Sequence, residues 1–147
     1  MHQPILRVKK LRENAVLPQY GSACAAGADL SACIPGEIEI APGETTLVPT
    51  GLAMEIPAGY AGLLYARSGL ASKRGLAPAN KVGVIDADYR GEVVVALHNH
   101  SNAPQTVRPG ERVAQLVVAP FLAARFEEAE ALDDTVRGVG GFGSTGA

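Results

Sequence analysis

The sequence predicts an all-β fold, a jelly-roll-like antiparallel sandwich or barrel with a flexible glycine-rich C-terminal tail. Short apolar and β-branched runs recur along the chain, separated by Gly, Pro or Asn, and helical periodicity is nearly absent. With 147 residues, 47% of them hydrophobic and 19% charged, the chain has the size and composition of one globular domain. We therefore expect a β domain at 1–132 and a mobile arm at 133–147.

Eight segments have the length and composition of strands. They are 5–11, 37–41, 45–50, 52–57, 60–66, 92–100, 112–120 and 123–129. Alternation is clearest at 37–40, where the two isoleucines would face the core and the two glutamates the solvent. Segment 5–11 is weaker because neither of its faces is cleanly apolar. One helical turn is expected at 68–73, where Ser68 would cap the helix.

The tail at 133–147 contains five glycines and only three large apolar side chains, a composition that favours mobility. Its glycine spacing also fits the G-x-G-x-x-G turn of dinucleotide-binding proteins. That turn needs a strand before it and a helix after it. Only Ala147 follows the last glycine, so the dinucleotide interpretation fails.

The charge and the cysteines limit the partners and the compartment. A formal net charge of -2 weakens any function based on broad binding to nucleic acid or to an anionic membrane. Cys24 and Cys33 are too few for a disulfide framework and wrongly spaced for a structural zinc site. No apolar run is long enough for a secretion signal or a membrane span. We expect a cytoplasmic protein without nucleic-acid or membrane partners.

Two enzyme motifs are missing, and one possible metal pair is weak. The chain has no P-loop, and it lacks the H-x-E and P-C-x-x-C pair of zinc-dependent nucleobase deaminases. His98 and His100 lie two apart on an expected strand and hence on one face. They could share a metal, but a surface pair is favoured because no third ligand lies nearby.

The segment 66–70 has the outline of an anion site. Arg67 and Ser68 stand at a strand end, just before a possible helix N-terminus. Free backbone N–H groups, the helix dipole and a guanidinium all favour phosphate oxygens. A solvated arginine beside a capping serine explains the same residues, and the spacing alone favours that simpler interpretation.

The segment 80–91 is predicted to form a hairpin with a functional tip. The backbone at its open end, together with the Asn80 amide, can pair with the edge of a base. Asp86 follows two apolar residues, so partial burial could raise its proton affinity, as a general base requires. An aspartate that bonds its own turn explains the position equally well.

The segment 109–115 is mainly a turn that leads into a strand. Gln115 lies between two apolar residues. It is either an ordinary outward-facing residue or a polar group turned toward a cleft, and the spacing does not decide between these.

Five segments, taken in order, resemble the motifs of the trimeric all-β dUTP pyrophosphatases, the dUTPases. They are 26–30, 67–70, 80–91, 109–115 and 137–146, which read AGADL, RSGL, NKVGVIDADYRG, PGERVAQ and RGVGGFGSTG. Each motif alone is weak, but five in register across 147 residues are specific. The chain departs from the pattern at Ala66, where many members carry proline, which concerns the rigidity of the turn rather than the chemistry.

The resemblance implies a jelly-roll homotrimer with three active sites, each built from more than one subunit, that acts on dUTP. Asn80 and the backbone at Gly83 and Val84 would pair with uracil, and Tyr89 would form the floor under the deoxyribose. The residues that would position the phosphate chain are Arg67, Ser68, Gly69 and Gln115.

The same resemblance implies the chemistry. Asp86 would activate a water that attacks the α-phosphorus and releases pyrophosphate and dUMP, which limits uracil incorporation into DNA and supplies thymidylate synthesis. Mg²⁺ would bridge the phosphates, with Asp29 acting through bound waters only. The arm would close over the substrate. Its residues would be Phe142, which stacks on uracil, and Arg137, Gly143, Ser144 and Thr145, which hold the terminal phosphates.

Two alternatives remain. A dCTP deaminase shares the fold and the triphosphate site, but it would need an additional acid–base Glu and typically shows Arg-Ser-Ser where this chain has Arg-Ser-Gly at 67–69. A non-catalytic jelly-roll binding module would carry Asp86 and the tail incidentally, and deletion of 137–147 would leave its binding unchanged.

Overall fold

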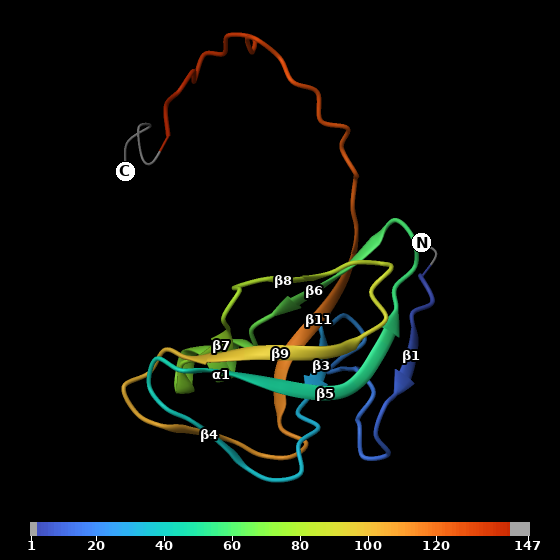
Figure 1. The fold of residues 1–147 in the computed structure, drawn as a ribbon, viewed down its shortest axis with the longest axis vertical. Helices are drawn as coiled ribbons and strands as arrows, with labels where there is room; N and C mark the ends of the chain where they lie inside the picture. The colour runs from blue at the N-terminus through green and yellow to red at the C-terminus, as the bar shows by residue number, and fades with distance from the viewer. Residues whose placement is uncertain (1–2, 142–147) are drawn as a thin grey trace.

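The computed structural model describes residues 3–141, which form two large antiparallel sheets, a two-stranded ribbon, one short helix and an arm that arches away from them (Figure 1). The four-stranded sheet has the order β1 (Arg7–Lys10), β5 (Thr45–Glu55), β9 (Glu92–Asn99), β7 (Leu76–Pro78). The five-stranded sheet has the order β2 (Gln19–Tyr20), β3 (Ala28–Ser31), β11 (Arg112–Pro120), β6 (Tyr60–Tyr65), β8 (Gly83–Ile85). A two-stranded ribbon pairs β10 (Gln105–Val107) with β4 (Ile38–Ile40), and α1 spans Ser68–Arg74.

The core lies between the two large sheets. Its fully buried side chains come from both, and include Leu52 of β5, Leu97 of β9, Leu30 of β3 and Val113 of β11. Apolar side chains that face each other across two sheets form the usual core of a sandwich. The predicted all-β sandwich is therefore confirmed, with α1 as the one helix among the described residues.

Most predicted strands form, and the two runs at 45–50 and 52–57 form one. They join as β5, whose register against β9 shifts between Pro49 and Ala53. Gly51 occupies this bulge with φ +68°, and a Cβ there would lie 2.7 Å from the sulfur of Cys33. Glycine thus lets β5 continue through a bend that other residues would strain.

Of two predictions of local structure, the alternation at 37–40 is confirmed and the helix cap at Ser68 is wrong. At 37–40 Ile40 is buried and the two glutamates are exposed, so the predicted alternation is confirmed. At α1 the capping prediction is wrong, because the N-cap residue is Arg67, without a side-chain cap bond, and Ser68 is the first residue of the helix. The helix ends at Gly75, whose φ of +68° and bond to the carbonyl of Ala71 close the last turn.

The arm begins directly after β11. Residues 121–141 form no helix or strand, and most of their side chains are exposed. The predicted strand at 123–129 is therefore wrong, because that segment has no neighbouring strand to pair with in this chain. Leu122 and Phe126 are 98% and 94% exposed, so apolar surface on the arm is left uncovered.

Candidate functional site

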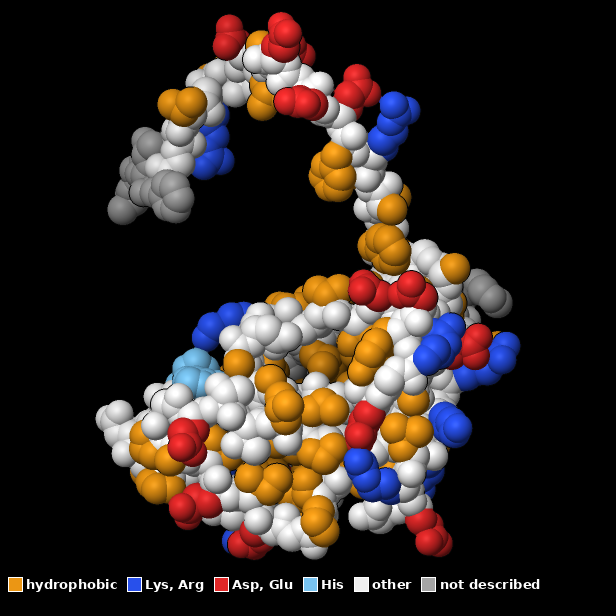
Figure 2. Space-filling model, viewed as in Figure 1, with side chains coloured by type: hydrophobic (Ala, Val, Ile, Leu, Met, Phe, Trp, Pro, Cys, Tyr) orange, Lys and Arg blue, Asp and Glu red, His pale blue; other side chains and the backbone are white. Residues whose placement is uncertain are grey.

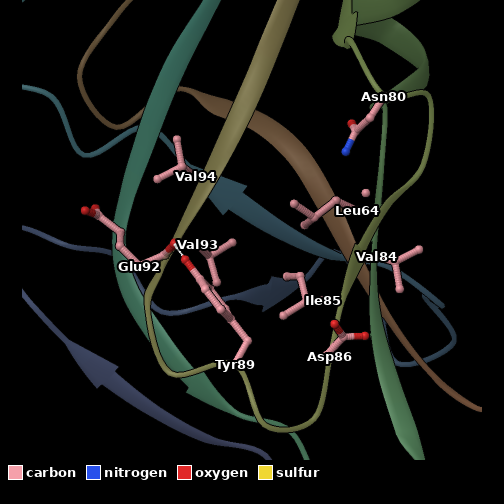
Figure 3. Close-up of a pocket in the computed structure, with 10 residues that line it drawn as sticks. Leu64, Asn80, Val84, Ile85, Asp86, Tyr89, Glu92, Val93 and Val94 are labelled. Atoms are coloured by element: carbon pink, nitrogen blue, oxygen red, sulfur yellow. Dashed lines mark hydrogen bonds between the residues drawn. The ribbon is translucent and has the colours of Figure 1, made fainter.

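A hollow of about 280 Å³ opens between β8 and β9 (Figure 2). The residues that line it are Leu64, Asn80, Gly83, Val84, Ile85, Asp86, Tyr89, Glu92, Val93 and Val94 (Figure 3). Aliphatic side chains form its inner wall, and polar groups stand around its mouth. This combination is typical of a small-molecule site.

Strand pairing places the hollow at a crossing between the two sheets. β8 pairs with β6, with Leu64 opposite Gly83, whereas β9 pairs with β5 and β7. The segment 80–91 therefore passes from one sheet to the other, and the predicted hairpin is wrong. The hollow lies at this crossing, because β8 belongs to the five-stranded sheet and β9 to the four-stranded sheet.

Gly83 keeps the inner end of the hollow open beside Asn80. A Cβ at Gly83 would lie 3.0 Å from Nδ2 of Asn80 and 3.2 Å from Cβ of Leu64. Figure 3 shows the Asn80 amide directed toward the hollow. A larger residue at 83 would displace this amide, so glycine at 83 lets the Asn80 amide lie beside the aliphatic wall of the hollow.

Asp86 and Tyr89 stand on the turn between β8 and β9. The amide N–H of Tyr89 donates to the carbonyl of Asp86 at 3.2 Å, and the phenol donates to the carbonyl of Glu92 at 2.9 Å. Tyr89 is 46% exposed. Asp86 is exposed as well, so the expected partial burial of its carboxylate is wrong for the single chain. Both side chains therefore stand at the mouth, with the Tyr89 ring turned back toward the start of β9 (Figure 3).

Glu92 and Arg12 support the hollow from behind, and sequence reasoning missed both. Nη1 and Nη2 of Arg12 donate to the Glu92 carboxylate at 2.6 and 3.0 Å, and the N–H of Gly51 donates at 2.8 Å. The Arg12 guanidinium holds the pKa of Glu92 below its usual value, and burial opposes this only in part. The pair is separated by 80 positions, so no local signal could have found it.

A second polar group forms around Asp29 on β3. Nε of Arg67 donates to its Oδ1 at 2.6 Å, and Nη1 of Arg112 donates to its Oδ2 at 3.1 Å. Strand register explains why Asp29 and Arg67 lie close together. Gln115 of β11 lies opposite both Asp29 of β3 and Tyr65 of β6, and Arg67 follows two residues after Tyr65. Arg112 was not predicted as a site residue, although its place three residues before Gln115 on the same strand could have indicated it.

Gln115 is turned toward this second group and is firmly held. Its Nε2 donates to the carbonyl of Ala66 at 2.8 Å. A Cβ at Gly27 would lie 2.3 Å from its Oε1, so the glycine of the first motif makes room for this amide. Ser68 and Gly69 are exposed at the start of α1 beside it.

The predicted site residues thus fall into separate sets within one chain. Asn80, Gly83, Val84, Asp86 and Tyr89 share the hollow. The second set, which does not line it, comprises Arg67, Ser68, Gly69 and Gln115.

The arm carries the remaining predicted residues. Arg137 is exposed, and its Nε donates to the carbonyl of Gly140 at 2.8 Å. The predicted arm residues Phe142, Gly143, Ser144 and Thr145 lie outside the described residues.

The carboxylates of the described residues suit a magnesium ion that keeps its bound waters better than a metal coordinated only by protein side chains. Within residues 3–141, no group of three or more His, Cys, Asp or Glu side chains could hold a metal. The carboxylate of Asp29 already accepts N–H groups from Arg67 and Arg112. Magnesium often keeps several waters and binds through one or two carboxylates and substrate phosphates. Asp29 therefore fits a ligand that acts through water.

The chain is similar to known proteins over nearly its whole length. The dUTPase family model matches residues 13–146. The deoxyuridine 5'-triphosphate nucleotidohydrolase of Syntrophotalea carbinolica is 50% identical over 141 residues, which cover 96% of each chain. That of Desulfitobacterium hafniense is 54% identical over 131 residues, which cover 88% of this chain and 87% of the relative.

Solved structures of phage enzymes share the fold. A mutant of the Staphylococcus bacteriophage 80alpha dUTPase with dUpNHpp superposes with a TM-score of 0.89 at 28% identity, over 99% of this chain and all of the other. A mutant dUTPase from phage phi11 of S. aureus, which coordinates a structural Mg(II) ion, gives a TM-score of 0.80 at 26% identity, over 89% of this chain and all of the other.

Proposed function

The chain belongs to the dUTPase family, and from that membership we propose that it hydrolyses dUTP to dUMP and pyrophosphate. This reaction limits uracil incorporation into DNA and supplies dUMP for thymidylate synthesis. The observation that carries the proposal is the hollow, where an amide, a carboxylate and an aromatic ring surround an aliphatic wall.

The inner end of the hollow selects the base. The Asn80 amide and the backbone of Gly83 and Val84 pair with the edge of uracil. Cytosine presents its donors and acceptors in the reverse order, so it would leave these groups unpaired. Unpaired buried polar groups are costly, and this gives strong discrimination from a few hydrogen bonds.

Tyr89 selects the sugar. Its ring lies at the mouth of the hollow, fixed through its hydroxyl to Glu92. A deoxyribose packs on the ring, whereas the 2′-hydroxyl of a ribose would collide with it. UTP is therefore a poor substrate.

Asp86 is the general base. Its exposed carboxylate at the mouth accepts a proton from water, and the water oxygen forms a bond to the α-phosphorus as the bond to the bridging oxygen breaks. The electron pair of the broken bond leaves with pyrophosphate. A neighbouring chain covers the site and removes this carboxylate from bulk solvent.

The phosphate chain is held by residues of other subunits in a homotrimer. Arg67, Ser68, Gly69 and Gln115 do not line the hollow of their own chain, so they serve the hollow of a neighbour. The arm closes the site, with Arg137, Gly143, Ser144 and Thr145 on the terminal phosphates and Phe142 on uracil.

Uncovered apolar surface supports the assembly. Figure 2 shows hydrophobic side chains gathered over β5 and β9. Among them Leu47 is 67% exposed and Val94 36%. Together with Leu122 and Phe126 of the arm, this surface is suited to contacts between subunits.

Asp29 serves magnesium through bound water. Its carboxylate accepts N–H groups from Arg67 and Arg112, which supports a role through bound water rather than as a direct ligand. When bound, the ion supplies charge that offsets the negative phosphates. Arg67 and Arg112 add positive charge of their own beside it.

We place the enzyme in the cytoplasm. Cys24 is exposed and free, and Cys33 is buried and free, which suits a reducing compartment. No helix within residues 3–141 combines the length and the apolar composition of a membrane span.

The test is pyrophosphate release from dUTP, dCTP, dTTP and UTP by the full chain with magnesium. We expect hydrolysis of dUTP, with the other three at least about 100-fold slower in kcat/KM. Ammonia release from dCTP is measured in parallel, because it would identify the deaminase alternative. Equal rates with all four nucleotides would contradict the assigned base pocket.

A further inference from the structure

The ring of Tyr89 is fixed from two directions. Its hydroxyl donates to the backbone carbonyl of Glu92 at 2.9 Å. Gly91 lies beside the ring, and a Cβ at that position would be 2.4 Å from the phenolic oxygen and 2.6 Å from Cζ. The position of the ring therefore depends on where the Glu92 backbone lies.

The side chain of Glu92 determines that backbone position, and it points away from the hollow (Figure 3). Its carboxylate accepts three N–H groups, two from Arg12 at 2.6 and 3.0 Å and one from Gly51 at 2.8 Å. Glu92 thus contributes to the hollow through its main chain, while its charge is neutralised behind the wall. It does not need to contact a nucleotide to influence one.

The far end of this connection is itself anchored. The N–H of Leu11, next to Arg12, donates to the carbonyl of Gly51 at 2.7 Å, and the N–H of Ala15 donates to the carbonyl of Arg12 at 3.1 Å. Gly51 packs against Cys33 and Ala15 without space for a Cβ. The backbone around Arg12 is therefore fixed, and its guanidinium holds the Glu92 carboxylate in one place.

We propose that the Arg12–Glu92 ion pair positions Tyr89 and thereby determines how strongly the enzyme rejects ribonucleotides. This inference rests on the proposed function, in which Tyr89 packs under the sugar. Small displacements of a positioning group have large effects on a site, up to about 100-fold for 1 Å. Loss of the pair lets the Glu92 backbone and the ring move, which opens space for a 2′-hydroxyl.

The alternative is that the pair only stabilises the fold. A control pair separates the two roles, since Nε of Arg108 donates to Glu37 at 3.0 Å in a second long-range pair whose residues do not line the hollow. The variants are Arg12→Met, Arg12→Lys, Tyr89→Phe, the double variant Arg12→Met with Tyr89→Phe, and Arg108→Met as control. Thermal unfolding of each variant confirms that it is folded.

The measurement is the ratio of kcat/KM for dUTP to that for UTP. We expect Arg12→Met and Tyr89→Phe each to lower the ratio about 3- to 10-fold. Arg12→Lys restores part of it, because it keeps the charge but not the two-pronged N–H contact, and Arg108→Met leaves it unchanged. The double variant falls no further than either single one, because both changes act through the same hydroxyl contact.

Two results would overturn the inference while the proposed function stands. One is an unchanged ratio in Arg12→Met, and the other is an additive loss in the double variant. Failure of the proposed function looks different, because the unmodified chain itself would then release no pyrophosphate from dUTP.

Discussion

The hollow beside Tyr89 and the arm at 121–141 are held in place in opposite ways. Around the hollow, β6 and β8 are paired residue by residue, and Glu92 binds three N–H groups from two other segments. The arm has exposed apolar side chains, and its N–H contact with the body comes from Phe121, which donates to the carbonyl of Gly59 at 3.1 Å. The wall of the hollow is formed within a single chain, whereas the arm leaves apolar side chains uncovered.

This difference suggests a division of tasks. Discrimination between bases and sugars requires fixed groups, because an error of an ångström removes it. Closure over a substrate requires a segment with a low cost of rearrangement, and such segments come from the least stable parts of a protein. The hollow has the fixed groups that discrimination requires, and the arm has the few contacts that closure requires.

The largest effect is expected inside the hollow. Asp86→Asn removes the proton acceptor, so kcat should fall by about 10²- to 10⁴-fold while dUTP binding stays within a few-fold. Pyrophosphate release and equilibrium binding measure the two quantities. Asp88→Asn, an exposed aspartate on the same turn, is the control and should keep its activity. Full turnover by Asp86→Asn would exclude the assigned base.

An intermediate effect is expected at the arm. A chain that stops at Arg137 should lose about 100-fold in kcat/KM, because the closing residues are gone. Its Tm should change by no more than about 2 °C, since the arm packs little against the body. Light scattering reports the assembly, and a trimer is expected before and after truncation. Dissociation to monomers would show that the arm is structural, and the contrast with the hollow would disappear.

The smallest effect concerns acid stability behind the hollow. Arg12 lowers the pKa of Glu92 in the folded chain from its ordinary 4.5, so the ionised form stabilises the fold above pH 4.5. That contribution is lost as the pH falls through the lowered folded pKa. Glu92→Gln should therefore lower the Tm by about 2 °C at pH 7, since the pair is partly exposed. The difference should vanish in acid.

Thermal unfolding between pH 3 and pH 7 checks this prediction. Glu128→Gln, on the exposed arm, is the matched control and should leave the pH profile unchanged. If the two variants changed the pH dependence of the Tm equally, the ion pair of Glu92 would contribute no more to stability than an exposed glutamate of the arm.

The fold was predictable where local pattern and pairing agree. Segment 112–120 has the same bounds as β11 because it is a long apolar run and lies centrally in its sheet, with partner strands on both sides. Segment 123–129 is more polar, with three charged residues, and no strand lies beside it. The short strands β2, β8 and β10 escaped prediction because two or three residues carry no periodicity, and tertiary pairing alone defines them.

The site was predictable only in part for the same reason. Asn80, Asp86 and Tyr89 are close in sequence, so one motif could indicate all three, and the structure places them around one hollow. The hairpin prediction for this motif was wrong because strand partners are a property of the whole sheet. Arg12 and Glu92 lie 80 positions apart and form their ion pair beside the bulge at Gly51, an arrangement that no short segment encodes.

The length of the arm also has a kinetic meaning. From Phe121 to Arg137 an extended chain can span up to about 55 Å, so Arg137 searches a limited volume around its attachment at β11. Attachment holds such a group at an effective concentration on the order of millimolar near sites within reach. In the proposed trimer, the encounter of Arg137 with phosphates bound at a neighbouring subunit would be intramolecular, and we expect turnover per subunit to stay constant on dilution for as long as the subunits remain together.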